Sequence, residues 1–257
     1  MLAAAGMAAG VISTVAGMAS LVSYPALLAV GLPPLSANVT NTVALLFTGA
    51  GAAAGSRPEL AGQGARVRRY GLVVAAGGAA GAAVLLTTPA MAFERAAPVL
   101  IGGASLVLLR PGMERPDSPG GASDGADGAE GSGTRADREH AWLAVGLFCA
   151  GGYIGYFGAA GGIVLLAILT AMLSQPLART NALKNVISGM ANCVAAVAFA
   201  VFGPVRWAAV GPLAAGFLAG GMIGPAIARR VPGRVLRIVI GVAGVAVAIR
   251  LALTAYR

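Results

Sequence analysis

Lys184 and the polar residues around it form the stretch of this sequence best suited to binding an ion. The stretch ARTNALKNVISGMANCVAAVAF spans residues 178–199, and its second half is as apolar as a membrane helix. Its first half contains Thr180, Asn181, Lys184 and Asn185, and Lys184 is the single lysine among the 18 basic residues. An ammonium group at the centre of a membrane helix costs about 2.5–3.5 kcal/mol, so it normally has a partner or a function.

The expected partner of a buried lysine is a carboxylate. We place all nine acidic residues in loops or in a central linker, and the last one along the chain is Glu139. Lys184 then has no acidic partner in its own half, and an anionic ligand would supply the missing charge. The alternative is that the lysine side chain extends to the lipid headgroups.

The composition indicates that the whole chain lies in a membrane. Of the 257 residues, 58% are hydrophobic and 11% are charged, whereas about a quarter of a typical globular chain is charged. The net charge of +9 comes from arginines in short clusters between apolar segments. This distribution is typical of cytoplasmic loops and not of a nucleic-acid-binding face. The N-terminus has no basic region, so we expect no cleaved signal peptide.

The apolar segments fall into two groups of four. They cover residues 2–31, 34–56, 70–88, 91–109, 141–173, 176–202, 205–228 and 234–254. The stretch between the fourth and fifth segments is rich in Gly, Pro, Ser and Asp and cannot bury a core. We therefore predict a first membrane repeat at 1–110, a flexible cytoplasmic linker at 111–139 and a second membrane repeat at 140–257.

The two groups share an order of features at an offset of about 140 residues. Each has a break of small residues, an apolar run, a proline turn and a polar patch at the start of a helix. This matched order predicts an internal repeat. The patches consist of Asn38, Thr40, Asn41 and Thr42 in the first half, and of Thr180, Asn181, Lys184 and Asn185 in the second.

The first segment of each group is too long for one straight crossing. A helix of about 30 residues measures about 45 Å, against a hydrocarbon core of about 30 Å. Both segments contain a break near the middle, so each could enter the membrane, turn near the midplane and return. A sharply kinked crossing helix is the alternative. Re-entrant segments would also put the arginine clusters at 57–69 and 229–237 on the cytoplasmic side.

The fold that these features predict is an all-α integral membrane protein with two inverted repeats. Each repeat consists of a re-entrant or broken helix followed by three transmembrane helices. Irregular backbone at membrane depth must be buried in protein or line a cavity. Two breaks that meet near the midplane would present helix N-termini to one cavity, and helix N-termini attract anions.

The two breaks supply further candidate substrate-binding residues, because their hydroxyl and backbone N–H groups could donate to an anion. For the glycines, the alternative is close helix packing. The asparagines, Asn192 included, either donate into the same cavity or bridge helices. Tyr24, Tyr153 and Tyr156 either line the cavity or anchor the membrane interface, and we assign Arg179 to a cytoplasmic loop. The candidates on the breaks are Gly17, Ser20, Ser23, Gly158, Gly161 and Gly162.

Three stretches resemble the repeated signatures of the TauE/SafE family, the so-called sulfite exporters. They read SLVSYPALLAVGLPPLSANVTNTVALL, GYFGAAGGIVLLAIL and RTNALKNVISGMANCVAAVAFAVFGPVRW. The resemblance covers nearly all of the chain except the linker. It implies a multi-pass protein of the bacterial cytoplasmic membrane that moves sulfite, sulfoacetate or other small organosulfur anions. The resemblance also implies a binding role for Asn38, Thr40, Asn41, Asn181, Lys184 and Asn185.

The leading hypothesis is a secondary transporter that exports small anions, most of all sulfite or organosulfonates such as sulfoacetate. An importer of another small anion, such as a carboxylate, is the alternative. A membrane-embedded enzyme could use Ser20 and Lys184 as a nucleophile pair, but we expect no catalytic residue, no metal and no cofactor. A non-transporting scaffold does not explain the matched polar patches. The expected partners are a small anion, the lipid bilayer and, as a further candidate, a second copy in a homodimer.

Overall fold

The described part of the chain is entirely helical. The computed structural model describes residues 1–109, 132–158, 161–173 and 175–228, together with a few residues between 242 and 253. Within these ranges there is no strand, which confirms the all-α prediction. The helices are α1 (Leu2–Ala16), α2 (Ser20–Ala29), α3 (Pro34–Gly55), α4 (Arg57–Leu60), α5 (Gly64–Thr87), α6 (Ala90–Leu109), α7 (Ser132–Tyr156), α8 (Gly161–Met172), α9 (Leu177–Phe202) and α10 (Trp207–Ala228).

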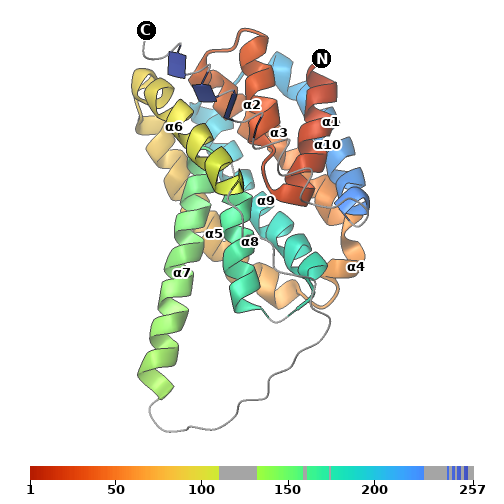
Figure 1. Ribbon diagram of the computed structural model, residues 1–257, viewed down its shortest axis with the longest axis vertical. Helices are drawn as coiled ribbons and strands as arrows, with labels where there is room; N and C mark the ends of the chain where they lie inside the picture. The colour runs from red at the N-terminus through yellow and green to blue at the C-terminus, as the bar shows by residue number, and fades with distance from the viewer. Residues whose placement is uncertain are drawn as a thin grey trace.

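Both over-long segments are interrupted where the small residues are. Helix α1 ends at Gly17, whose φ of 74° and ψ of 27° are left-handed, and the Gly17 N–H donates to the Ser13 carbonyl at 2.8 Å. Glycine takes this conformation without steric penalty, which ends the helix. Helix α7 ends just before Gly158, which has a φ of 75°. In Figure 1, α1 and α2 lie in the upper half of the molecule, whereas α7 and α8 extend toward the lower end.

Prolines start the two helices that contain the polar patches. Pro33 caps α3, and Pro34 is its first residue. Pro176 caps α9 with a φ of −53° and a ψ of 141°. Proline suits the first turn of a helix because the N–H that it lacks would have no partner there. The patches therefore lie in the first turns of α3 and α9, as predicted.

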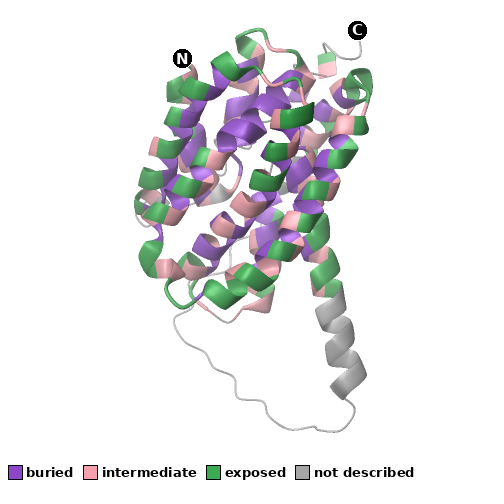
Figure 2. Ribbon diagram, turned by 180° about the vertical axis from the view of Figure 1, so that it is seen from behind, coloured by how far each residue is buried: buried purple, intermediate pink, exposed green. Residues whose placement is uncertain are grey.

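The outer surface of the described helices is apolar. Three of them are long and apolar enough to cross a membrane, namely Gly64–Thr87, Leu177–Phe202 and Trp207–Ile227. Large side chains such as Leu72, Val197 and Phe202 point outward and are 61%, 59% and 76% exposed. Figure 2 shows exposed residues along the outside of the bundle and buried residues inside it. These features identify an integral membrane protein, because water does not favour such a surface.

Helices of one half pack against helices of the other half. Helix α1 packs on α10, α7 packs on α5, and α3 packs on α9. The contacts depend on glycine: a methyl group at Gly81 would overlap the Gly152 carbonyl, and one at Gly216 would overlap that of Ala3. Small residues let helix backbones approach closely in membranes. The helices that carry the breaks are thus fixed by long helices of the opposite half.

Two details differ from the sequence analysis. Glu94 lies in the second turn of α6 and is half-buried, so the placement of every acid in a loop or linker was wrong for this residue. Glu94 falls inside the apolar segment predicted at 91–109, which is helical from Ala90 onward. Helix α7 begins at Ser132 and therefore includes residues 132–139 of the predicted linker. The arginine cluster at 229–237 and most of the segment predicted at 234–254 lie outside the described residues.

Candidate functional site

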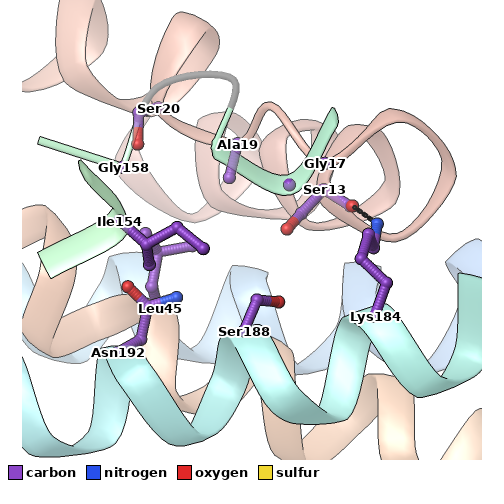
Figure 3. A pocket seen from close by; sticks show the side chains of 11 residues that line it. Ser13, Gly17, Ala19, Ser20, Leu45, Ile154, Gly158, Lys184, Ser188 and Asn192 are labelled. Carbon is purple, nitrogen blue, oxygen red and sulfur yellow. Dashed lines mark hydrogen bonds between the residues drawn. The ribbon is translucent and has the colours of Figure 1, made fainter. Parts of the chain in front are cut away.

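A small polar cavity lies where the two breaks meet α9. Its volume is about 30 Å³. Gly17 and Ser20 border it from the first break, Gly158 and Gly162 from the second, and Lys184 from α9. Figure 3 shows the breaks on one side of this space and the side chains of α9 on the other. The cavity therefore receives residues from both halves of the chain.

The backbones of the two breaks are in direct contact beside the cavity. A methyl group at Gly17 would lie 2.9 Å from the Gly162 Cα, and one at Gly162 would lie 2.8 Å from the Gly17 Cα. No larger side chain fits here without movement of the backbone. Close packing and cavity lining, which the sequence analysis treated as alternatives for the glycines, thus occur together at Gly17 and Gly162.

Lys184 points into the protein. Its side chain is 1% exposed, and its Nζ donates a long hydrogen bond of 3.4 Å to the Ser13 carbonyl (Figure 3). The lysine therefore does not extend to the headgroups. Within the described residues no carboxylate pairs with it. The Ser13 carbonyl belongs to the C-terminal end of α1, and a helix C-terminus carries about half a negative elementary charge. The positive charge of the ammonium is therefore only partly balanced.

The amides of α9 hold the end of α1. Asn181 and Asn185 both donate through Nδ2 to the Thr14 carbonyl, at 2.8 and 3.3 Å. Carbonyls in the last turn of a helix have no hydrogen-bond donor within the helix. The amides of α9 supply the donors for the Thr14 carbonyl. These two asparagines bridge helices of opposite halves and fix the position of the first break.

One amide of α3 acts on the second break in a corresponding way, whereas another contacts the first break. Asn38 donates through Nδ2 to the carbonyl of Tyr156, the last residue of α7, at 3.0 Å. Asn41 donates to the Ser20 hydroxyl at 3.1 Å. The Oδ1 atoms of both asparagines are buried and have no hydrogen-bond partner among the described residues. Each polar patch thus caps the broken helix of the other half.

Three other candidate residues do not line the cavity and support the packing around it. The Ser23 hydroxyl donates to the Ala19 carbonyl at 2.9 Å within α2. Thr40 Oγ1 accepts from the backbone N–H of Arg206 at 3.0 Å, ahead of α10. A methyl group at Gly161 would come within 2.5 Å of Ile154 Cγ1, so this glycine lets α8 start against α7.

Ser13, Ser188 and Asn192 also line the cavity, and of these the sequence analysis did not select Ser13 and Ser188. Lys184, Ser188 and Asn192 are spaced four residues apart, so they share one face of α9 (Figure 3). This spacing was available in the sequence and would have identified Ser188. Ser13 could not be found in this way, because its contribution is a position at the end of another helix.

The tyrosines and Arg179 have structural contacts. Tyr24 is 1% exposed and packs edge-to-face on Phe157, with ring centroids 5.7 Å apart, so it is not an interfacial anchor. Tyr156 packs against Phe93 at 6.1 Å. Arg179 Nη2 donates to the Ala61 carbonyl at 2.6 Å, in the connection between α4 and α5. Arg179 itself lies in the first turn of α9, so its assignment to a loop was wrong, although its side chain reaches a connection between helices.

The electrostatics of the cavity favour negative charge. Helices α2 and α8 begin at Ser20 and Gly161, beside the cavity, and helix N-termini are partially positive. Lys184 adds a full positive charge. Ser20 accepts from Asn41 while Lys184 donates to Ser13, so the two do not form a nucleophile–base pair here. No cluster of His, Cys, Asp and Glu suited to a metal occurs among the described residues.

The protein has apolar outer faces, broken helices and a buried cation at the breaks. These are features of integral membrane proteins that bind cargo at discontinuous helices. The family is given by the sequence itself. The chain belongs to the sulfite exporter TauE/SafE family, whose model matches residues 2–251. Comparison with curated proteins and with solved structures gave no match. Membership of this family makes the protein a transporter of the sulfite-exporter type.

Proposed function

We propose that the protein exports small sulfur oxyanions, either sulfite or small organosulfonates such as sulfoacetate, and that the anion binds in the cavity beside Lys184. The observation that carries this proposal is the ammonium of Lys184, buried to 1% exposure without a carboxylate partner among the described residues. A buried charge needs compensation. The carbonyl of α1 balances the positive charge of Lys184 only in part, and a bound anion would balance the rest.

The shape of the site supports a small cargo. The cavity of about 30 Å³ has room for about two to three water-sized groups, since one such group needs roughly 10–15 Å³. This scale suits an anionic head with few atoms. Serine hydroxyls at 13, 20 and 188 and the amide of Asn192 border the same space and could donate to oxyanion oxygens.

The cross-packing of the two halves supports an inverted-repeat mechanism. Helix α1 packs on α10 of the other half, and α7 packs on α5 in the corresponding way. In the alternating-access mechanism of such transporters, the halves rock around a fixed central site. We propose that the chain crosses the bacterial cytoplasmic membrane several times, with α1–α2 and α7–α8 as re-entrant pairs from opposite sides. A homodimer stays a proposal, which the mass of the purified complex would test.

Binding measurements on purified protein would test the site. Sulfite, sulfoacetate and acetate are added separately to the wild type, to Lys184→Ala and to Arg69→Ala, and apparent stability is followed, since a specific ligand raises it. We expect sulfur anions to stabilise the wild type and Arg69→Ala, which loses one exposed charge. Lys184→Ala should bind about 10- to 100-fold more weakly, the value of a hydrogen bond to a charged group.

Flux into proteoliposomes should follow the same order as binding. Equal binding and flux in Lys184→Ala and the wild type would overturn the proposed site. Stabilisation by acetate and by no sulfur anion would favour the carboxylate alternative.

A further inference from the structure

A second cavity adjoins the one beside Lys184. Its volume is about 20 Å³, and it lies between α3 and α9. The two cavities share Ser13, Leu45, Ser188 and Asn192 as lining residues. Because the same few side chains border both spaces, a small displacement of one of them would join the cavities into a single site.

Thr48 gives the second cavity an unused hydrogen-bonding group. Its side chain is 4% exposed, and its Oγ1 has no hydrogen-bond partner among the described residues. Buried polar groups normally have partners, so an exception of this kind calls for a ligand or a water. Thr48 lies seven residues after Asn41 on α3, and therefore on the helix face that also carries the polar patch.

Among the described residues, no charged side chain lines the second cavity. Besides the shared residues, its polar lining consists of Thr14, Thr48 and Asn185. Asn185 donates to the Thr14 carbonyl at 3.3 Å, and the Ser188 hydroxyl donates to the Asn185 carbonyl at 3.2 Å. A neutral donor or acceptor of the cargo can bind to such a lining. A carboxylate at that end of the cargo would be buried without a counter-charge. The lining thus discriminates between kinds of cargo.

Two glycines provide the space. Gly49 of α3 and Gly189 of α9 both line the second cavity. A methyl group at Gly189 would lie 3.5 Å from the Gly49 Cα, which is an ordinary contact distance. This position therefore allows the second cavity to be narrowed by one methyl group with little strain on the fold.

We propose that the two cavities together bind one molecule with unlike ends. Its sulfonate lies beside Lys184, and its tail carries an uncharged hydrogen-bonding group, such as a hydroxyl, beside Thr48. The preferred cargo is then a short sulfonate with a neutral polar tail, ahead of a dianion of the same length. This inference rests on the proposed function, because it takes the cavity beside Lys184 as the anion site.

The test compares four ligands by their dissociation constants with the purified protein: sulfite, ethanesulfonate, 2-hydroxyethanesulfonate and sulfoacetate. In the wild type, 2-hydroxyethanesulfonate should bind about 2- to 10-fold more tightly than ethanesulfonate, as expected for one added neutral hydrogen bond. Thr48→Val should abolish that difference and leave sulfite binding unchanged. Thr48→Ser, which keeps the hydroxyl, should retain the preference. Gly189→Ala should weaken binding of both ethyl sulfonates and spare sulfite.

The outcomes separate the two proposals. If the sulfur anions bind in a Lys184-dependent way but the hydroxyl gives no advantage in the wild type, only the second-cavity inference is overturned. The same conclusion follows if Thr48→Val keeps the preference or if sulfoacetate binds more tightly than 2-hydroxyethanesulfonate. If no sulfur anion binds the wild type, or if Lys184→Ala binds all of them equally well, the proposed function fails together with this inference.

Discussion

Lys184 Nζ donates a hydrogen bond to the backbone carbonyl of Ser13, 3.4 Å away, and so links α9 of the second half to the last turn of α1 in the first. A corresponding link runs the other way, from Asn38 of α3 to the Tyr156 carbonyl at the end of α7. Each long helix that begins after a proline thus holds the broken helix of the opposite half. Lys184 and Ser13 line the cavity together with residues of both breaks, so whatever moves the breaks also changes the cavity.

Replacing Lys184 by Met should separate stability from function. Methionine is close to lysine in length and has no charge to bury, and exchanging a buried charge for an apolar side chain is often neutral or stabilising. We therefore expect Lys184→Met to unfold at the same temperature as the wild type or higher. Sulfite should raise the unfolding temperature of the wild type but not that of Lys184→Met. Thermal unfolding with and without sulfite measures both effects. A clearly lower unfolding temperature would instead indicate that the ammonium serves mainly to cap α1.

Removing the amide at Asn181 or Asn38 should destabilise the protein. Each deletion leaves a helix-terminal carbonyl without the hydrogen bond that now measures 2.8 or 3.0 Å. Loss of a partner from a buried polar group costs about 1–3 kcal/mol. We expect Asn38→Ala to lose this amount and Asn181→Ala to lose less, because Asn185 still donates to the Thr14 carbonyl at 3.3 Å. Chemical unfolding in detergent measures both losses, and a larger loss in Asn181→Ala than in Asn38→Ala would contradict this order.

An alanine at Gly162 should push the two breaks apart. The added methyl group would lie 2.8 Å from the Gly17 Cα, whereas one at Gly211 of α10 would have no neighbour within 4 Å. Overpacking of this kind typically costs about 1–3 kcal/mol, so Gly162→Ala should unfold more readily and transport less. Gly211→Ala is the matched control and should be as stable as the wild type or slightly more so, because alanine favours helix over glycine. Equal stability of both variants would contradict the contact between the breaks.

Cysteine labelling would decide whether α1 and α2 form a re-entrant pair. Cys149 and Cys193 are exposed and free, so both are first replaced by serine, and single cysteines are then introduced at Leu2, Val30 or Ala61. For a re-entrant pair, a membrane-impermeant reagent should reach positions 2 and 30 from one side of the membrane and position 61 from the other. Labelling of positions 2 and 30 from opposite sides would mean that the segment crosses the membrane with a kink.

Much of the helical architecture could be predicted from the sequence because its causes are local. Apolar runs marked the long helices, prolines marked the starts of α3 and α9, and glycine marked the end of α1, where a left-handed residue is required. The failures were also local. Glu94 was assigned to a loop although it lies inside the apolar segment predicted at 91–109, and Ser188 was passed over although it continues the face of Lys184.

The tertiary structure alone decided what the polar residues do. The sequence by itself determined that Lys184 is an isolated cation in an apolar helix, but not that its side chain turns inward to Ser13, 171 positions earlier in the chain. The roles of Asn38 and Asn181 depended in the same way on carbonyls of the opposite half. Local patterns specify which backbone groups a helix leaves unpaired, whereas the partner of such a group is set by how distant helices pack.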